Sequence, residues 1–326
     1  MRRSYTVPTA VILLVTALLL MISATACGSA STPPAATQSP TSAPTPTAES
    51  PAETEPVSEA TEAVEADLEE FDPSNFSNPT VIDNPWFPMK PGMQYIYEGN
   101  TEEAGLSIPH RVIITFTDMT KVIDGVRTLV AWDQDFSASS LVETELAFFA
   151  QDDDGNVWRL GEYPEVYEEG KLVEVPTWFT GLKGARAGII IPADPQLGDP
   201  SFSQGWAPAV NFTDRGQVSQ VGEKTCVPVD CYENVLVIEE FSLEEPDAFQ
   251  LKYYAQDVGN VRVGWKGEDA TQEELELVEI VELTPEAMEE VHTAALELEQ
   301  RGYELSKEVY AETSPIELPS SDAESG

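Results

Sequence analysis

Beyond residue 92 the apolar positions of the chain recur with a period of two. Val112, Ile114 and Phe116 fall on one phase of this alternation, which predicts a half-buried β-strand. Asp124-Gly125 lies between two such runs, and this dipeptide favours a tight hairpin turn. Further strand-like runs cover residues 141–150, 157–160, 171–175, 188–191, 216–225, 232–241, 249–255, 260–265 and 274–283.

These runs are joined by short turns, and no helical segment lies between them. Strands without interleaved helices favour antiparallel pairing over parallel pairing. We therefore predict a mainly β fold for residues 71–283, either an antiparallel β-sandwich or a curved half-barrel. The alternation fits both.

The periodicity changes after residue 283. Thr284-Pro285-Glu286 has the features of a helix start, with a capping side chain, a proline in the first turn and an acidic residue. The apolar residues that follow recur every three or four positions: Ala287, Met288, Val291, Ala294, Ala295 and Leu298. We predict an amphipathic C-terminal helix within 284–311, packed on the β domain, with Gly302 ending its first segment. Residues 312–326 are expected to form a disordered acidic tail.

The N-terminal pattern is that of an export signal. Arg2 and Arg3 precede an apolar run at 10–22, which is too short for a comfortable transmembrane helix. Ala24-Thr25-Ala26-Cys27-Gly28 resembles a bacterial lipobox, although Ala24 stands where leucine is usual. The resemblance implies a signal peptide at 1–26, a lipid on Cys27 and attachment to the extracytoplasmic face of the cell membrane. An ordinary secretory signal or an uncleaved anchor are the alternatives.

A stalk and a plug loop are expected between the lipid and the strands. Residues 27–70 are rich in Ser, Thr, Ala, Pro and Glu and contain no aromatic residue, so we predict a disordered linker. Residues 84–92, here called the plug loop, read Asn-Pro-Trp-Phe-Pro-Met-Lys-Pro-Gly. Their prolines exclude regular structure, while Trp86 and Phe87 require burial at the edge of the core.

Charge and cysteine content narrow the function. The formal net charge is −41, and residues 71–311 hold 45 Asp and Glu against 15 Lys and Arg. Such a surface lacks the cluster of basic residues that binds phosphate groups, so nucleic acid is not an expected partner. Cys226 and Cys231 are predicted to form a structural disulfide, as expected for an even pair in an exported domain. A redox-active pair is the alternative, but the Cys-x-x-Cys spacing is missing.

Several short motifs resemble those of a family of uncharacterised secreted bacterial lipoproteins. The similarity spans residues 84–310, and its landmarks are the plug loop, Asp154-Gly-Asn-Val-Trp158 and Tyr253-Tyr-Ala255 with Val258-Gly259. The resemblance implies an exported β domain but no assigned activity. The two cysteines of the domain are not part of the family pattern, which favours a local role for their disulfide.

Few residues suggest catalysis. His110 and His292 are the only histidines and have no ligand spacing nearby, so both are expected at the surface or its boundary. No nucleophile elbow, phosphate loop or dinucleotide fingerprint occurs, and no cofactor is expected. Asp152 and Asp154 are a weak calcium candidate, because the carboxylates of an EF-hand loop are missing and a tight turn explains them. Aromatic residues form a core or, alternatively, a ligand groove made of Trp132, Trp158, Trp206, Tyr253 and Tyr254.

The leading hypothesis is a non-catalytic surface lipoprotein that binds a small ligand or another envelope component through its curved sheet. The alternative is an extracellular hydrolase that uses carboxylates, with or without calcium. A spacer or assembly protein without a small ligand is the third reading.

Overall fold

The computed structural model describes residues 68–319. The predicted signal peptide, Cys27, the stalk up to residue 67 and residues 320–326 lie outside the described residues. None of the helices in 68–319 has the length and apolar character needed to cross a membrane.

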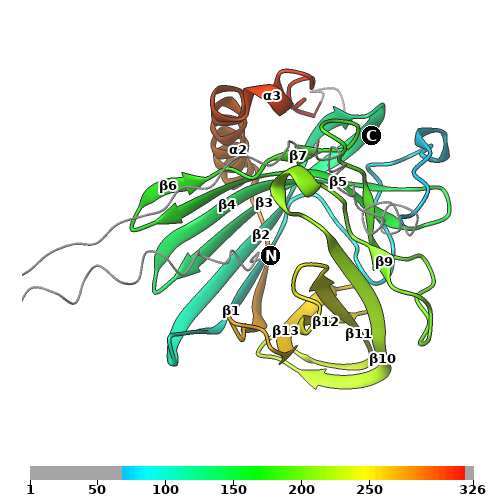
Figure 1. Ribbon diagram of the computed structural model, residues 1–326, viewed down its shortest axis with the longest axis vertical. Coiled ribbons are helices and arrows are strands. Elements are labelled where there is room, and N and C mark those ends of the chain that lie inside the picture. The colour runs from blue at the N-terminus through cyan, green and yellow to red at the C-terminus, as the bar shows by residue number, and fades with distance from the viewer. Residues whose placement is uncertain (1–67, 320–326) are drawn as a thin grey trace, which may run out of the picture. The chain divides into compact units, whose positions relative to one another are not determined.

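Within these residues the strands form one antiparallel sheet that is not closed (Figure 1). Its order is β6-β5-β4-β3-β2-β1-β14-β13-β12-β11-β10-β9, and β7 and β8 also pair with β5. The strands are β1 (Met93–Glu103), β2 (Leu106–Ile123), β3 (Val126–Ser137), β4 (Ser140–Gln151), β5 (Val157–Glu168), β6 (Lys171–Glu174), β7 (Trp178–Phe179), β8 (Gly188–Ile191), β9 (Phe202–Ser203), β10 (Asp214–Cys226), β11 (Cys231–Ser242), β12 (Ala248–Ala255), β13 (Gly259–Gly267) and β14 (Glu274–Glu282). The predicted mainly β antiparallel fold is confirmed, and it is a single open sheet.

Local sequence explains the turns between these strands. Asp124 and Gly125 both have positive φ, 46° and 83°, which a two-residue hairpin turn requires at both positions. The hairpin predicted there joins β2 to β3. Cys226 and Cys231 face each other at the end of the β10–β11 hairpin and are joined by a disulfide, as predicted.

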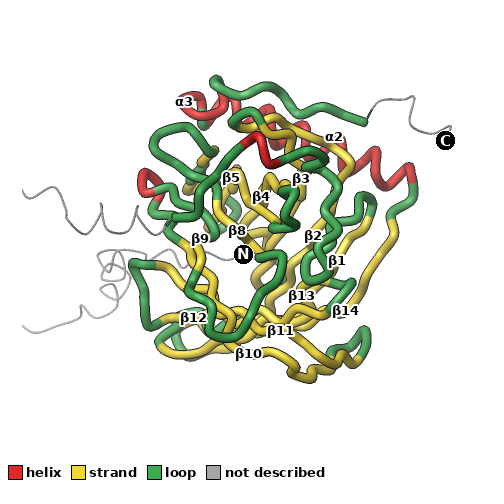
Figure 2. The backbone as a smooth tube through the Cα atoms, turned by 90° about the vertical axis from the view of Figure 1, so that its right-hand side faces the viewer, coloured by secondary structure: helices red, strands yellow, loops and turns green. Residues whose placement is uncertain are grey.

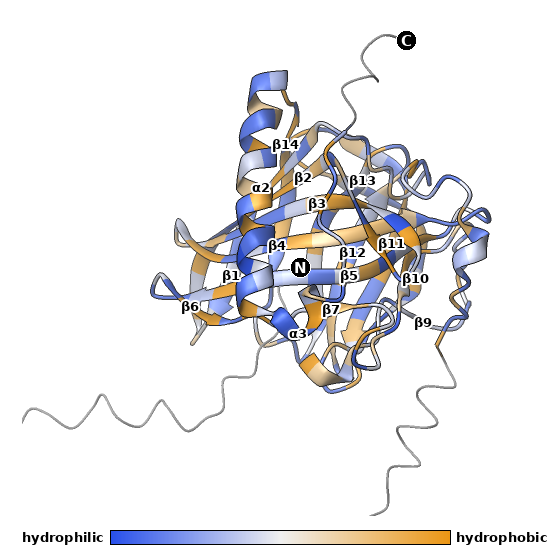
Figure 3. Cartoon of the chain, turned by 90° about the horizontal axis from the view of Figure 1, so that it is seen from above, coloured by the Kyte–Doolittle hydropathy of each residue, from blue (hydrophilic) through white to orange (hydrophobic). Residues whose placement is uncertain are grey.

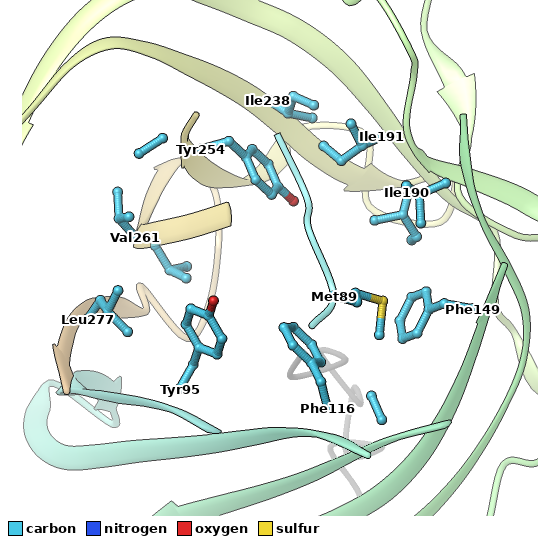
Figure 4. Close-up of a cluster of buried hydrophobic side chains, with 14 of the residues drawn as sticks. Met89, Tyr95, Phe116, Phe149, Ile190, Ile191, Ile238, Tyr254, Val261 and Leu277 are labelled. Carbon is cyan, nitrogen blue, oxygen red and sulfur yellow. The ribbon is translucent and has the colours of Figure 1, made fainter. Parts of the chain in front are cut away.

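The sheet curls because strands far apart in its order share one core. Figure 2 shows the curled backbone of the sheet. Phe149 of β4, Tyr254 of β12 and Leu277 of β14 belong to the same buried cluster (Figure 4). The face that carries this cluster is called the concave face here, and the opposite face of β2–β5 the convex face.

The plug loop closes one end of the concave face. Met89 is 1 % exposed and lies among the labelled side chains of Figure 4. Main-chain hydrogen bonds connect this loop to the β12–β13 turn, from Asp257 N–H to the Pro85 carbonyl (2.7 Å), and to β2, from Gly92 N–H to the Phe116 carbonyl (2.8 Å). Trp86 and Phe87 pack against the concave core, which agrees with the burial expected of them.

The C-terminal helices cover the convex face. Helix α2 (Pro285–Leu305) lies across β2–β4 in Figure 3, and α3 (Lys307–Tyr310) follows it. Thr284 caps α2 by accepting a bond from Ala287 N–H, 3.2 Å, as its position predicted. Gly302 does not end the helix, so that expectation is wrong. A Cβ at Gly302 would lie 2.5 Å from the Tyr310 ring, so the glycine admits close packing of that ring.

Part of the expected tail is also ordered. Thr120 and Glu317 exchange two main-chain hydrogen bonds, 2.9 and 2.7 Å, and Ile316 is buried in the convex core. The prediction of disorder from residue 312 is therefore wrong for 312–319. The acidic composition of the tail predicted disorder, but the single buried apolar residue Ile316 anchors the segment.

One ion pair is buried beneath this cover. Lys121 Nζ lies 2.8 Å from Glu299 Oε1, and both side chains are enclosed. Glu299 also accepts bonds from Ile316 N–H, and the Tyr310 ring lies 5.0 Å from the ammonium. Burial lowers the pKa of Lys121, and the Glu299 carboxylate partly offsets this effect. Each charge of this pair thus has several partners.

Candidate functional site

The five aromatic residues of the predicted groove are divided between two faces. Trp132 and Trp158 pack in the convex core, where their indole N–H groups donate to Thr144 and Asp152. Tyr254 is buried in the concave core, and Tyr253 packs against that core. Trp206 pairs with Arg186 in an isolated bridge and belongs to neither of these two core clusters.

The weak calcium candidate is a turn held by its own hydrogen bonds. Asp152 accepts bonds from the N–H groups of Asp154 (3.1 Å) and Asn156 (2.8 Å), and from the Asn156 and Trp158 side chains. Asp154 accepts a bond from Asn75, 3.0 Å. No group of three or more metal-ligating side chains occurs within residues 68–319.

A different set of residues gathers charge on the concave face. Asp133 pairs with Glu145 across β3 and β4, and Asp135 pairs with Glu143. Ala131 and Ala147, two residues further from the hairpin tip, belong to the concave core, so the alternation places all four carboxylates on that face. These four residues are called the carboxylate ladder.

The ladder follows from a short sequence pattern that our sequence analysis missed. Asp-x-Asp ends β3, Glu-x-Glu begins β4, and the turn at Ala138-Ser139 has positive φ at both residues. Acidic residues in phase on both arms of a hairpin must share one face once the register is set. The signal was therefore present in residues 133–145.

Asp135 lies beside a buried histidine. His110 is 2 % exposed, with Nδ1 3.3 Å from Asp135 Oδ1 and Nε2 2.8 Å from Glu273 Oε1. Burial acts to raise the pKa of Glu273, but the His110 hydrogen bond and the Lys252 charge outweigh it and lower the pKa to about 2. The expectation that His110 lies at the surface or its boundary is wrong, because the loop before β14 brings Glu273 over it.

Asp133 and Glu145 lack such partners. Within residues 68–319 no donor bonds the enclosed Oδ1 of Asp133, and neither carboxylate forms an ion pair with a described side chain. Glu145 is 6 % exposed, and Asp133 is partly buried. The positive charge of Arg159 acts on both Asp133 and Glu145, and Arg159 also forms an ion pair with Glu162. Asp133 and Glu145, here called the inner ladder pair, are the carboxylates on this face whose charge is least compensated.

Burial dominates the electrostatics of this inner pair. It raises the pKa of Asp133 to about 6, and the charges of Glu162 and Asp135 add to this effect. Burial likewise raises the pKa of Glu145 well above its usual range, with Glu162, Glu143 and Asp133 contributing. Displaced pKa values of this kind gather at binding and catalytic sites more often than elsewhere.

A buried tyrosine, Tyr97, lies near the ladder, since the charge of Asp133 acts on its hydroxyl. Tyr97 is buried and donates to the Asn260 carbonyl, 2.7 Å. The ring of Tyr254 projects into the concave core in Figure 4. Burial raises the pKa of the Tyr254 hydroxyl, and the Glu240 carboxylate adds to the effect. The concave face therefore passes from an apolar floor to an acidic region within a few residues.

A hollow of about 520 Å³ lies beside His110 at the end of β1, β2 and β3. The alternation along β2 places Arg111 and Ile113 on the face opposite His110, and Arg111 lies 3.8 Å from Glu98. The residues that line the hollow are Glu98, Gly99, Pro109, His110, Arg111, Ile113, Phe136 and Ser139.

Comparison with known proteins gives two distant structural likenesses. No protein-family model and no curated protein matches the chain. A protein from Bacteroides fragilis, described as exported and as having a YmcC-like fold, has 13 % identity and a TM-score of 0.35, covering 60 % of this chain and 98 % of that one. A protein from Parabacteroides distasonis, described as a lipoprotein, has 12 % identity and a TM-score of 0.30, covering 61 % of this chain and 99 % of that one. Neither likeness is close enough to transfer a function.

Proposed function

We propose that the chain is a lipid-anchored protein of the extracytoplasmic face of the cell membrane, and that its β domain binds a small ligand on the concave face without catalysis. The lipobox-like sequence at Cys27 and the signal-like residues before it support the anchor. The acidic balance of the chain disfavours nucleic acid as a partner.

One observation carries the binding proposal. The inner ladder pair, Asp133 and Glu145, is directed to the concave face beside buried tyrosines and has no compensating ion pair within residues 68–319. Burying a carboxylate without a partner is costly, so a fold that keeps two of them side by side favours a ligand that supplies the partner. Ligand sites commonly combine an apolar lining with a few convergent polar groups.

The test has one arm for each half of the proposal. Cells expressing the full chain are labelled with a radioactive fatty acid, and the label is expected on the wild type and not on Cys27→Ser. The full chain, purified from membranes in a mild detergent, is then analysed by native mass spectrometry. A non-covalent mass that disappears on denaturation supports ligand binding. A bare chain, with no stabilisation by any compound of a broad panel, would contradict it.

A carboxylate hydrolase is the second candidate, and the raised pKa values of Asp133 and Glu145 favour it. A carboxyl group whose pKa is raised by burial is what a general acid requires. The discriminating experiment is turnover of glycan and ester substrates, with and without calcium, by wild type and Glu145→Gln. Turnover that this substitution abolishes would replace the binding proposal by the hydrolase.

A further inference from the structure

We infer that the ligand is a small organic amine, with its protonated ammonium group held between Asp133 and Glu145 and its apolar part against the tyrosine-lined floor of the concave face. This inference rests on the proposed ligand-binding function and names the chemical class of the ligand.

The register of β3 and β4 places carboxylates directly opposite each other. Residues directly opposite each other on antiparallel strands have Cβ atoms about 4.5–5.5 Å apart, and like charges at that distance repel. The ladder contains two such pairs in succession, Asp133 with Glu145 and Asp135 with Glu143. His110 contacts the outer pair through Asp135. The inner pair forms no ion pair with a side chain of residues 68–319, although the charge of Arg159 acts on both of its carboxylates.

Both carboxylates of the inner ladder pair are at least partly buried. Glu145 is 6 % exposed, and no described residue donates a hydrogen bond to it. Asp133 Oδ1 is enclosed and also without a donor. Bulk water therefore replaces a partner poorly at Asp133 Oδ1, and a bound cation would remove both the repulsion between the carboxylates and the desolvation cost.

The arrangement fits an ammonium group better than a metal ion. Residues 68–319 hold no cluster of three or more side chains suited to one metal. A protonated primary amine has three N–H donors, so it can bond both carboxylates at once at about 2.7–2.9 Å. Two opposed carboxylates on one pleated face match that requirement without further ligands.

The neighbours of the pair indicate an apolar body on the amine. The next residues on the same face are Ala131 and Ala147, which pair with each other and belong to the concave core. Beyond them lie Phe149 and Met89 of the same core. Tyr97 lies near Asp133, whose charge acts on its hydroxyl, and tyrosine rings are suited to contact a cation or an alkyl chain.

The experiment compares ligands that share one apolar body and differ in their head group. Hexylamine, hexanol, hexanoate and hexyltrimethylammonium are titrated into the full chain in a mild detergent, with the same micelles as blank. We expect saturable binding of hexylamine, at least tenfold weaker binding of the trimethyl compound, and no measurable binding of hexanol or hexanoate. The double variant Asp133→Asn/Glu145→Gln should lose hexylamine binding by tenfold or more.

A matched control removes two carboxylates elsewhere. Glu274→Gln/Glu279→Gln changes two exposed positions of β14 and should bind hexylamine as the wild type does. Circular dichroism and the thermal midpoint establish that both double variants are folded. Hexanol or hexanoate binding as tightly as hexylamine, with no loss in the ladder variant, would overturn the amine inference and leave concave-face binding standing. A chain that binds none of these compounds and is bare in native mass spectrometry would overturn both.

Discussion

The two faces of the sheet treat buried charge in opposite ways. On the convex face Lys121 meets Glu299 at 2.8 Å, Glu299 accepts further bonds from Ile316 N–H, and Tyr310 lies against the ammonium. On the concave face Asp133 faces Glu145, a group of its own sign, and no ion pair from residues 68–319 relieves either one. The convex pair is closed and structural, whereas the inner ladder pair is open to a partner of opposite charge.

The difference lies in what covers each site. Helix α2 and the segment 312–319 bring a complementary carboxylate and backbone groups onto Lys121. The inner ladder pair instead adjoins its own sheet and the tyrosines of the concave core. A fold can hold a buried charge cheaply only where the chain supplies all the partners, so an uncompensated pair indicates a place where the fold is not optimised for stability alone.

The largest effect is expected from opening the convex pair. Glu299→Gln leaves Lys121 buried without its counter-charge, and it should lower the free energy of unfolding by roughly 3–5 kcal/mol. Urea denaturation measures this, with the exposed Glu297→Gln as control. The apolar double variant Lys121→Met/Glu299→Leu should recover most of the loss. If Glu299→Gln lowered the free energy of unfolding by less than about 1 kcal/mol, the Lys121–Glu299 pair would not be the stabilising buried ion pair that the comparison requires.

The compensated end of the concave face gives the next effect. The folded pKa of Glu273, about 2, lies below its unfolded value of about 4.3, so its contribution is complete above pH 4.3 and is lost as the pH falls towards 2. Glu273→Gln should therefore destabilise the chain by roughly 2–3 kcal/mol at pH 7 and by little at pH 2. Unfolding at several pH values measures this. The adjacent, exposed Glu274→Gln should show no such pH-dependent difference.

A smaller effect is expected where Tyr310 is seated over Lys121. Gly302→Ala places a methyl group against the Tyr310 ring, and overpacking of this kind costs about 1–3 kcal/mol. Thr293→Ala on an exposed position of the same helix is the control. Stabilisation by Gly302→Ala, as helix propensity alone predicts, would show that the ring moves freely.

The smallest expected change in the free energy of unfolding is a stabilisation, in contrast to the three destabilising variants above. The folded pKa of Asp133, about 6, lies above its unfolded value of about 3.9, so wild type loses stability as the pH rises from 4 to 6. Asp133→Asn removes this titration. The difference between the two pKa values corresponds to at most ~3 kcal/mol, and because Asp133 is partly exposed we expect the variant to be more stable than wild type by about 1 kcal/mol at pH 8, with the two equal near pH 4. Thermal unfolding at both pH values measures the difference. A less stable variant at pH 8 would mean that Asp133 has a partner within the fold.

Much of the fold could be predicted from local pattern. The Asp124-Gly125 hairpin, the Thr284 helix start and the Cys226–Cys231 disulfide depend on neighbouring residues, and all three are present. The ordered segment 312–319 depends on contacts with Thr120 and Glu299, which are far away in sequence. Composition gave no hint of those contacts.

The candidate site was harder to predict for the same reason. His110 is buried only because residue 273 returns to it after more than 160 positions. The ladder is more local, since its four residues lie on one hairpin, yet the pairing register had to be known before they could be placed opposite each other. The aromatic residues that suggested a groove were counted without their faces, and the alternation sends two of them to the convex side.

The inner ladder pair can be tested directly by isothermal titration of hexylamine into the full chain at pH 6, in two buffers with different ionisation enthalpies. An ammonium group that binds the ionised carboxylates lowers their pKa values, so binding should release protons and the measured heat should differ between the buffers. We expect saturable binding with proton release in the wild type and neither in Asp133→Asn/Glu145→Gln. Equal heats in both buffers, or unchanged binding in the double variant, would contradict the account.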